Sequence, residues 1–193
     1  MKFLRFLGNE FFLGTLIALL SVFTAVASYQ GGMADSKQNE FEIKGMKELN
    51  DGNAEYLRAN QMIVYDYTMF DGWYTADTAD KEEYYQASYS QELQDSIAAN
   101  PDEPFSEAYY DAMYADSYAY WNDSDADFDT AGQWDERGDG LQAVGLTLAL
   151  GLAFAAWGSL AKEESKMRLI FSLLGVVMLI LGLISYLGVP AVV

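Results

Sequence analysis

Four carboxylates in the second half of the chain have nearly the spacing of a calcium-binding loop. They occupy positions 1, 3, 5 and 12 of a twelve-residue stretch and are Asp125, Asp127, Asp129 and Glu136. An EF-hand loop places oxygen ligands at these positions and requires glycine at position 6, where this stretch has Thr130. The stretch is therefore a candidate calcium site. The alternative is a solvated acidic linker whose charges favour the start of the following helix.

The rest of the chain offers little other chemistry. Its 193 residues include no cysteine and no histidine. Disulfides, thiolate metal sites and thiol nucleophiles are therefore excluded, as are imidazole ligands and the commonest general base. Aspartate and tyrosine side chains could transfer protons, but no spacing singles out a catalytic pair. We therefore expect a protein without enzymatic activity and with no cofactor other than the calcium considered above.

Three apolar segments indicate an all-α membrane protein with three transmembrane helices. They are residues 11–27, 141–160 and 169–187, and none contains a charged residue. A helix needs about 20 apolar residues to cross the hydrocarbon core of a bilayer. The second and third segments reach that length, and the first approaches it with its flanks.

The first apolar segment could also be a signal peptide. Lys2 and Arg5 give it a basic start, and Ala25-Val26-Ala27 resembles a cleavage site. Against cleavage, Glu10 lies directly before the apolar run, and the run is long for a signal core. We therefore expect this segment to be retained as a membrane anchor.

The placement of lysine and arginine predicts the orientation of the chain. Two basic residues precede the first span and three lie in the short link between the second and third; they are Lys2, Arg5, Lys162, Lys166 and Arg168. Both segments must lie on one side of a three-span protein, and short cytoplasmic segments are rich in lysine and arginine. We therefore expect a plasma or inner membrane protein whose amino terminus is cytoplasmic. Residues 30–139 and the carboxyl terminus would then lie outside.

Residues 30–139 form an acidic, aromatic-rich segment between the first two spans. They carry 26 of the chain's 29 acidic residues and 6 of its 11 basic residues. Negative charge at this density repels nucleic acid and attracts cations or basic partners. The charge could instead be a solubility device of a salty or acidic habitat. On either interpretation, no nucleic-acid partner is expected.

The first part of this segment has the alternating three- and four-residue spacing of a coiled-coil seam. The positions that follow this spacing are Ile43, Met46, Asn50, Asn53, Leu57, Asn60 and Val64. A buried asparagine at such a position fixes register and partner number at a cost in stability. The alternative leaves the three asparagines in water and places the core one position over, through Met46, Leu49, Tyr56 and Ile63.

The exterior segment is expected to form an antiparallel helical hairpin. One helix would run from the first span to Phe70, since Asp71-Gly72 is a turn signal. The chain would return through residues 80–121, with one break at the prolines of the Pro101–Pro104 segment.

An aromatic stripe with helical spacing follows the prolines. It comprises Tyr110, Tyr114, Tyr118 and Trp121. Such a stripe is more often a packing surface than a cofactor site. It is also the candidate docking face of the exterior segment.

The second span carries small residues at a four-residue spacing, which lets helix backbones approach closely. Gly151 and Ala155 are the candidate interaction residues on this face. The favoured interpretation is that the second and third spans pack against each other as a hairpin, because a short link joins them. The alternative is that the face docks the span of a partner.

Three stretches carry a family resemblance, namely residues 22–32 (VFTAVASYQGG), residues 50–61 (NDGNAEYLRANQ) and the span pair at 141–187. Together they resemble a prokaryotic family of three-span membrane proteins of unknown function. Its members have one amino-terminal span, an exterior helical hairpin and two closely spaced carboxy-terminal spans. That family tends to show Trp-Ala-Tyr-Tyr-Gln in the exterior helix, where this chain has Ala54-Glu55-Tyr56-Leu57-Arg58. The resemblance implies the architecture and transfers no activity or functional residue.

These observations divide the chain into three parts. Residues 1–29 are the cytoplasmic amino terminus and first span, residues 30–139 are the exterior domain, and residues 140–193 are a transmembrane hairpin with a short outer tail. We expect a structural or accessory subunit of a larger membrane complex, or a homo-oligomer, whose partners are the lipid bilayer and other membrane subunits or a second copy. The alternatives are a small cation-handling, channel-like protein and a calcium-binding, membrane-anchored interaction protein.

Overall fold

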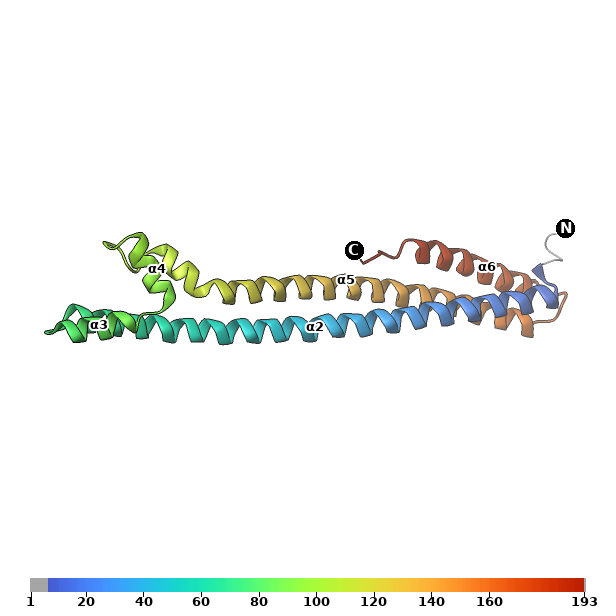
Figure 1. The fold of residues 1–193 in the computed structure, drawn as a ribbon. Coiled ribbons are helices and arrows are strands. Elements are labelled where there is room, and N and C mark those ends of the chain that lie inside the picture. Colours follow the sequence, from blue (N-terminus) through green and yellow to red (C-terminus); the bar gives the residue numbers. More distant parts are fainter. Residues whose placement is uncertain (1–6, 193) are drawn as a thin grey trace. The chain divides into compact units, whose positions relative to one another are not determined.

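The computed structural model describes residues 7–192, and every regular element in that range is a helix (Figure 1). In chain order the helices are α2 (Glu10–Tyr74), α3 (Ala79–Ala87), α4 (Gln91–Ala99), α5 (Glu107–Leu160) and α6 (Lys166–Leu187). The all-α class predicted from the sequence is therefore confirmed for the described residues. The basic start at Lys2 and Arg5 lies outside them.

Three of these helices, α2, α5 and α6, are long and apolar enough to cross a membrane. Each contains one of the three apolar segments identified in the sequence. The helix α6 is little longer than its segment: Ser165 caps its start by accepting a hydrogen bond from the backbone N–H of Met167 at 3.2 Å. Length and composition thus fit a membrane protein.

The helices α2 and α5 continue far beyond their apolar segments. Proline is the strongest helix breaker, and the chain's three prolines, Pro101, Pro104 and Pro190, all lie outside these two helices. As predicted, one helix contains the first apolar segment and reaches Phe70. The turn expected at Asp71-Gly72 is wrong, because both residues are helical and α2 ends at Tyr74.

The segment after α2 is more broken than the sequence analysis predicted. It contains two interruptions, one between α3 and α4 and one between α4 and α5. The second coincides with the expected prolines. The first arises at Ser90, whose hydroxyl accepts from the backbone N–H of Leu93 at 3.1 Å and so caps a new helix. Serine is a preferred residue at this position because its oxygen satisfies a backbone donor that the helix leaves unpaired.

The chain divides into two compact units. Unit 1 comprises the described parts of Met1–Phe41 and Asp129–Val193, and unit 2 comprises Glu42–Phe128. The sequence analysis had placed the domain boundaries close to the apolar segments, at residues 29/30 and 139/140. In unit 1, however, Tyr186 donates to Gln30 at 2.9 Å and Arg137 donates to the Pro190 carbonyl at 2.6 Å. These contacts fasten the chain around α6 to stretches that the sequence had assigned to the exterior domain.

The core of unit 1 is aliphatic. Its buried members are Leu16, Leu20, Ala27, Val144, Leu148 and Ala155. They come from α2 and α5, and residues of α6, including Val176 and Leu179, pack against them. All three candidate spans therefore share one apolar cluster.

The core of unit 2 is aromatic. Its buried members are Ile63, Tyr89, Leu93 and Tyr109. Partly buried rings surround them: Phe70 lies 5.2 Å from Trp73 and 5.3 Å from Phe105 between ring centroids. Tilted and edge-to-face pairs at such distances are the favoured arrangements of aromatic rings.

Neither predicted seam is the face that α2 buries within unit 2. The first seam is largely exposed, with Ile43, Leu57 and Val64 each more than three-fifths accessible. In the alternative seam, Ile63 is buried, but Met46, Leu49 and Tyr56 are exposed. The buried positions are Gly45, Gly52, Ala59, Ile63 and Asp66. Hydropathy does not mark this face because two of its members are glycines and one is an aspartate.

Candidate functional site

The four candidate calcium ligands lie along α5, which is helical throughout residues 125–136. Calcium loops of the EF-hand type instead take their ligands from a non-helical segment that wraps around the ion. Asp127 is buried, whereas Asp125, Asp129 and Glu136 are exposed. Within residues 7–192, no group of three or more carboxylates is placed to hold a metal ion. Calcium binding stays a prediction for which the fold offers no formed site.

Asp127 instead joins α5 to α2. Its Oδ1 accepts a hydrogen bond from Nζ of Lys44 at 2.9 Å. The hydrogen bond to Asp127 raises the pKa of the Lys44 amine, and the negative charge of Asp127 and its neighbours adds to the effect. One turn away on α5, the buried hydroxyl of Ser124 donates to the carbonyl of Gly45 at 2.9 Å. Both contacts fasten the same pair of helices.

Aromatic rings of α5 lie directly against the glycines of α2. A Cβ atom at Gly52 would lie 2.6 Å from Cδ1 of Trp121 and 3.1 Å from Cβ of Tyr120. A Cβ atom at Gly45 would lie 3.1 Å from the ring of Phe128. The two glycines therefore make room for rings that a larger residue would displace.

The predicted aromatic stripe is mostly a packing surface within unit 2. Tyr114 stacks on Tyr56 with ring centroids 5.1 Å apart, and its hydroxyl donates to Oδ1 of Asn60 at 2.9 Å. The hydroxyl groups of Tyr110 and Tyr67 share a hydrogen bond of 2.5 Å. This bond and burial raise the pKa of Tyr110 to about 12. Burial also raises the pKa of Tyr114.

The remaining two residues of the stripe differ in exposure. The ring centroid of Trp121 lies 5.7 Å from that of Tyr56, and Trp121 is half-buried. The ring of Tyr118 packs on that of Trp121 with centroids 5.8 Å apart, but 47% of the surface of Tyr118 stays accessible. Of the four, Tyr118 therefore retains the most area for a contact with another molecule.

Asp66 is the centre of a buried polar network that the sequence analysis missed. Its side chain is fully buried. Oδ1 accepts from the backbone N–H of Ser90 at 2.8 Å, and Oδ2 accepts from the hydroxyl groups of Ser90 and, at 2.8 Å, Tyr109. Ser90 caps α4 and Tyr109 lies on α5. One carboxylate on α2 thus fixes the starts of both later helices.

The network keeps its phenols protonated. Burial raises the pKa of Tyr109 strongly, and the hydrogen bond to Asp66 and its charge raise it further. Burial and the charge of Asp66 also raise the pKa of Tyr89 to about 12. A protonated phenol can only donate its hydrogen to the carboxylate, and all the partners of Asp66 are internal. The arrangement is therefore that of a structural network, in which the donors to Asp66 come from Ser90 and Tyr109 and join helices of the chain.

The candidate interaction residues of α5, Gly151 and Ala155, face α6 and α2 inside unit 1. A Cβ atom at Gly151 would lie 2.8 Å from Cβ of Met178 and 2.9 Å from Cδ2 of Leu20. A Cβ atom at Gly175 of α6 would lie 3.4 Å from Cβ of Ala155 and 3.4 Å from the Gly151 carbonyl oxygen. Gly151 and Ala155 are thus occupied by contacts within the chain.

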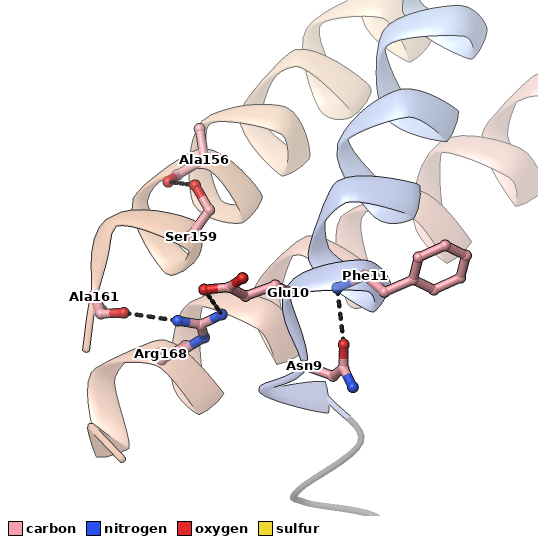
Figure 2. A network of polar contacts seen from close by, with 7 residues as sticks. All are labelled: Asn9, Glu10, Phe11, Ala156, Ser159, Ala161 and Arg168. Atoms are coloured by element: carbon pink, nitrogen blue, oxygen red, sulfur yellow. Dashed lines mark hydrogen bonds and ion pairs between the residues drawn. The ribbon is translucent and has the colours of Figure 1, made fainter. Parts of the chain in front are cut away.

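A buried arginine joins the helix ends of unit 1 (Figure 2). Arg168 is only 3% exposed and donates from Nη1 to the carbonyl of Ala161 at 3.0 Å. Its Nη2 lies 4.0 Å from Oε1 of Glu10, and Asn9 caps the same end of α2 by accepting from the Phe11 N–H at 2.8 Å. In the sequence, Arg168 was one of the basic residues that predicted the orientation of the chain. In the structure it also ties the link after α5 to the starts of α6 and α2.

No protein-family model matches this chain, and no curated protein or solved structure matches it either. The resemblance to three-span proteins of unknown function therefore stays an expectation, and the site must be interpreted from its own residues. One signal in the sequence does point to the missed network. Gly45, Gly52, Ala59 and Asp66 recur every seven residues, which is the repeat of a packed helix face.

Proposed function

We propose that this chain is a non-enzymatic integral membrane protein that serves as a structural or accessory subunit, in a larger membrane complex or in a homo-oligomer. The observation that carries the proposal is the use of the buried carboxylates in unit 2. Asp66 and Asp127 both hold one helix to another through hydrogen bonds. A catalytic carboxylate would instead line a cleft that a substrate can enter.

The proposed topology has three spans, formed by the apolar parts of α2, α5 and α6. The amino terminus and the link at residues 161–165 would be cytoplasmic. Residues 30–139 and the carboxyl terminus would be outside the plasma or inner membrane. The support is the bias of lysine and arginine in the short segments, together with the length and composition of the three helices.

The proposed exterior part is an antiparallel helical hairpin. Its support is the order of contacts within unit 2: Gly45 lies against Phe128, and Asn60 accepts from Tyr114. Residue numbers therefore rise along α2 as they fall along α5. A hairpin fastened by Asp66 and by rings seated on glycine would be a stiff support for docking, and its negative charge would favour partners with basic surfaces.

The test is the size of the native particle after gentle solubilisation of membranes, with mass spectrometry of the chains that migrate with it. The chain itself has a mass of 21.5 kDa. Comigration with other chains in fixed proportion, or a homogeneous assembly of several copies, is the expected result. A monodisperse monomer without companions, at every detergent concentration that keeps it folded, would contradict the proposal.

A further inference from the structure

An apolar seam on α2 has no partner within unit 2. Ile43, Asn50, Leu57 and Val64 recur every seven residues, and Met46, Asn53 and Asn60 follow the first three of them by three residues. Ile43, Met46, Leu57 and Val64 are between 57% and 69% exposed, and Asn50 and Asn53 are exposed as well. Asn60 is half-buried and already accepts from Tyr114, so it is the member of the seam that has a partner within unit 2.

The seam is distinct from the face that α2 turns to α5. That inner face runs through Gly45, Gly52 and Ala59, and it is already filled by the rings of α5. The apolar side chains of a heptad seam stabilise a protein only when another helix packs on them and removes them from water. Four large apolar side chains in one exposed row of a strongly acidic unit therefore mark an interface.

The charges beside the seam favour a second copy of this chain. The positions that flank the seam are Glu42, Lys47, Leu49, Ala54, Tyr56, Gln61 and Ile63, which include one acid and one base. The seam is therefore neutral within a segment that is otherwise strongly negative. In a parallel pair of helices, a residue just before one core position faces the residue five places later on the other helix. Glu42 of one copy would then face Lys47 of the other.

The asparagines specify the geometry of that pair. Asparagine at a core position pairs with the same asparagine of a parallel, in-register partner and disfavours other registers. Two copies anchored by the same first span in one membrane leave it in the same direction, so their α2 helices are parallel. The sequence of the seam and the membrane anchor thus demand the same arrangement.

We infer that residues 43–64 of α2 form a parallel, in-register coiled-coil interface with the same residues of a second copy of this chain. The inference rests on the proposed function and deepens it, because it selects self-association and names its surface. Asn50 and Asn53 set the register, and the four large apolar residues supply the buried area.

The test uses single cysteines, since the natural chain has none. Leu57→Cys and Asn53→Cys are introduced separately into the full-length protein in native membranes, which are then mildly oxidised. A disulfide requires Cα atoms within about 7 Å, and the core positions of a parallel, in-register pair hold identical residues at about this distance. Both variants are expected to give covalent dimers on a non-reducing gel.

Arg58→Cys is the matched control. It lies next to Leu57 on the same helix, and its side chain is 71% exposed, but it is outside the seam. The inference predicts severalfold less covalent dimer for this variant than for either seam variant. Equal amounts in all three variants, or no dimer at Leu57→Cys and Asn53→Cys, would overturn it.

Alkaline extraction of the same membranes separates failure of the inference from failure of the proposed function. A chain that stays in the membrane and migrates with other subunits, yet gives no seam-specific dimer, would overturn self-association and leave the accessory role standing. A chain released into the soluble fraction would overturn the membrane role, whatever the cross-linking pattern.

Discussion

Units 1 and 2 both use glycine to bring helices together, but different groups fill the space. In unit 1, Gly151 lies against Leu20 and Met178; in unit 2, Gly52 lies against Trp121. In lipid, apolar side chains gain nothing by leaving the solvent, so close backbone contact must hold helices together. In water, burying a ring is itself stabilising. With unit 1 in lipid and unit 2 in water, as proposed above, one residue type would serve two solvents for two different reasons.

The two units also differ in how they hold buried charge. Unit 2 encloses Asp66 completely and gives it donors from Ser90 and Tyr109. Unit 1 buries Arg168 at a helix end, where a backbone carbonyl accepts from it. A fully buried carboxylate is tolerated only when its hydrogen bonds are complete. Loss of the Asp66 side chain should therefore be costly to unit 2.

The largest expected effect comes from Asp66→Ala. The change leaves Tyr109 and Ser90 with buried donors and no acceptor, at a cost of about 1–3 kcal/mol for each such group. We expect unit 2 to lose about 3 kcal/mol or more of its free energy of unfolding, with amide exchange rising first in α4 and at the start of α5. Hydrogen–deuterium exchange of the full chain in detergent measures this loss region by region.

Asp66→Asn is the control for that change, since it keeps the shape and one carbonyl acceptor. It should cost clearly less than the alanine variant. Equal protection in Asp66→Ala and the natural protein would show that the network does not hold unit 2. Equal loss in both units would mean that the two are not stabilised separately.

In unit 1 the corresponding test is Gly151→Leu. The added side chain would enter the space of Met178 and Leu20, and overpacking of this kind costs about 1–3 kcal/mol. We expect lower resistance to denaturant in mixed micelles. Gly14→Leu is the control, because no atom lies within 4 Å of a Cβ at Gly14. If both variants behaved alike, the contact between α5 and α6 would not depend on the glycine.

A smaller effect is expected for Gly52→Ala in unit 2. The new methyl group would press on Trp121 at a cost of about 1–3 kcal/mol, partly offset by the roughly 1 kcal/mol that alanine gains over glycine in a helix. A modest net loss should appear in thermal melts followed by circular dichroism. Gly132→Ala, whose Cβ would meet nothing within 4 Å, should instead be neutral or stabilising.

Replacing the ring of Trp121 by a smaller side chain should relieve the crowding that Gly52→Ala causes. In the double variant Gly52→Ala with Trp121→Leu, the second substitution should cost less than it does alone, because the methyl group then fills vacated space. Strict additivity of the two losses would argue against direct contact between ring and backbone.

The smallest expected effect on stability concerns the tyrosines of unit 2, and it appears only in alkaline solution. The pKa values of Tyr89 and Tyr110 are raised to about 12, whereas an unfolded chain releases these protons near pH 10, as is usual for tyrosine. Raised pKa values in the folded state mean that this stability is complete below about pH 10 and is lost as pH rises from about 10 to 12. Unit 2 should therefore lose part of its stability in this window, as followed by ellipticity and amide exchange.

Tyr110→Phe checks the origin of that loss. The variant removes one raised pKa, so the slope of stability against pH between about 10 and 12 should be shallower than in the natural protein. An unchanged slope, or earlier unfolding of unit 1, would contradict the assignment to these phenols.

The sequence predicts the elements that depend on local composition. The apolar segments mark the three candidate spans, and the absence of proline accounts for the length of α2, which ends at Tyr74 close to the predicted Phe70. The break at Ser90 was missed because it depends on Asp66, a residue 24 positions earlier that accepts from its backbone N–H. Hydropathy could not reveal such a contact.

The candidate site shows the same limit. The spacing of Asp125, Asp127 and Asp129 suggested a shared ion, but on a helix two-residue steps point in widely different directions. Asp127 was predicted only as one of four calcium ligands, and in the structure it accepts from Lys44. The glycine face was invisible to a search for apolar residues, because glycine contributes space and not a side chain.

The most direct test of the central claim is the accessibility of single cysteines in intact cells. Gln61→Cys reports on the exterior segment, and Glu163→Cys reports on the link between α5 and α6; both residues are exposed. The account predicts that a membrane-impermeant maleimide labels Gln61→Cys from outside and labels Glu163→Cys only after the membrane is permeabilised. Labelling of both from the same side, or the reverse pattern, would contradict a three-span protein with its acidic unit outside.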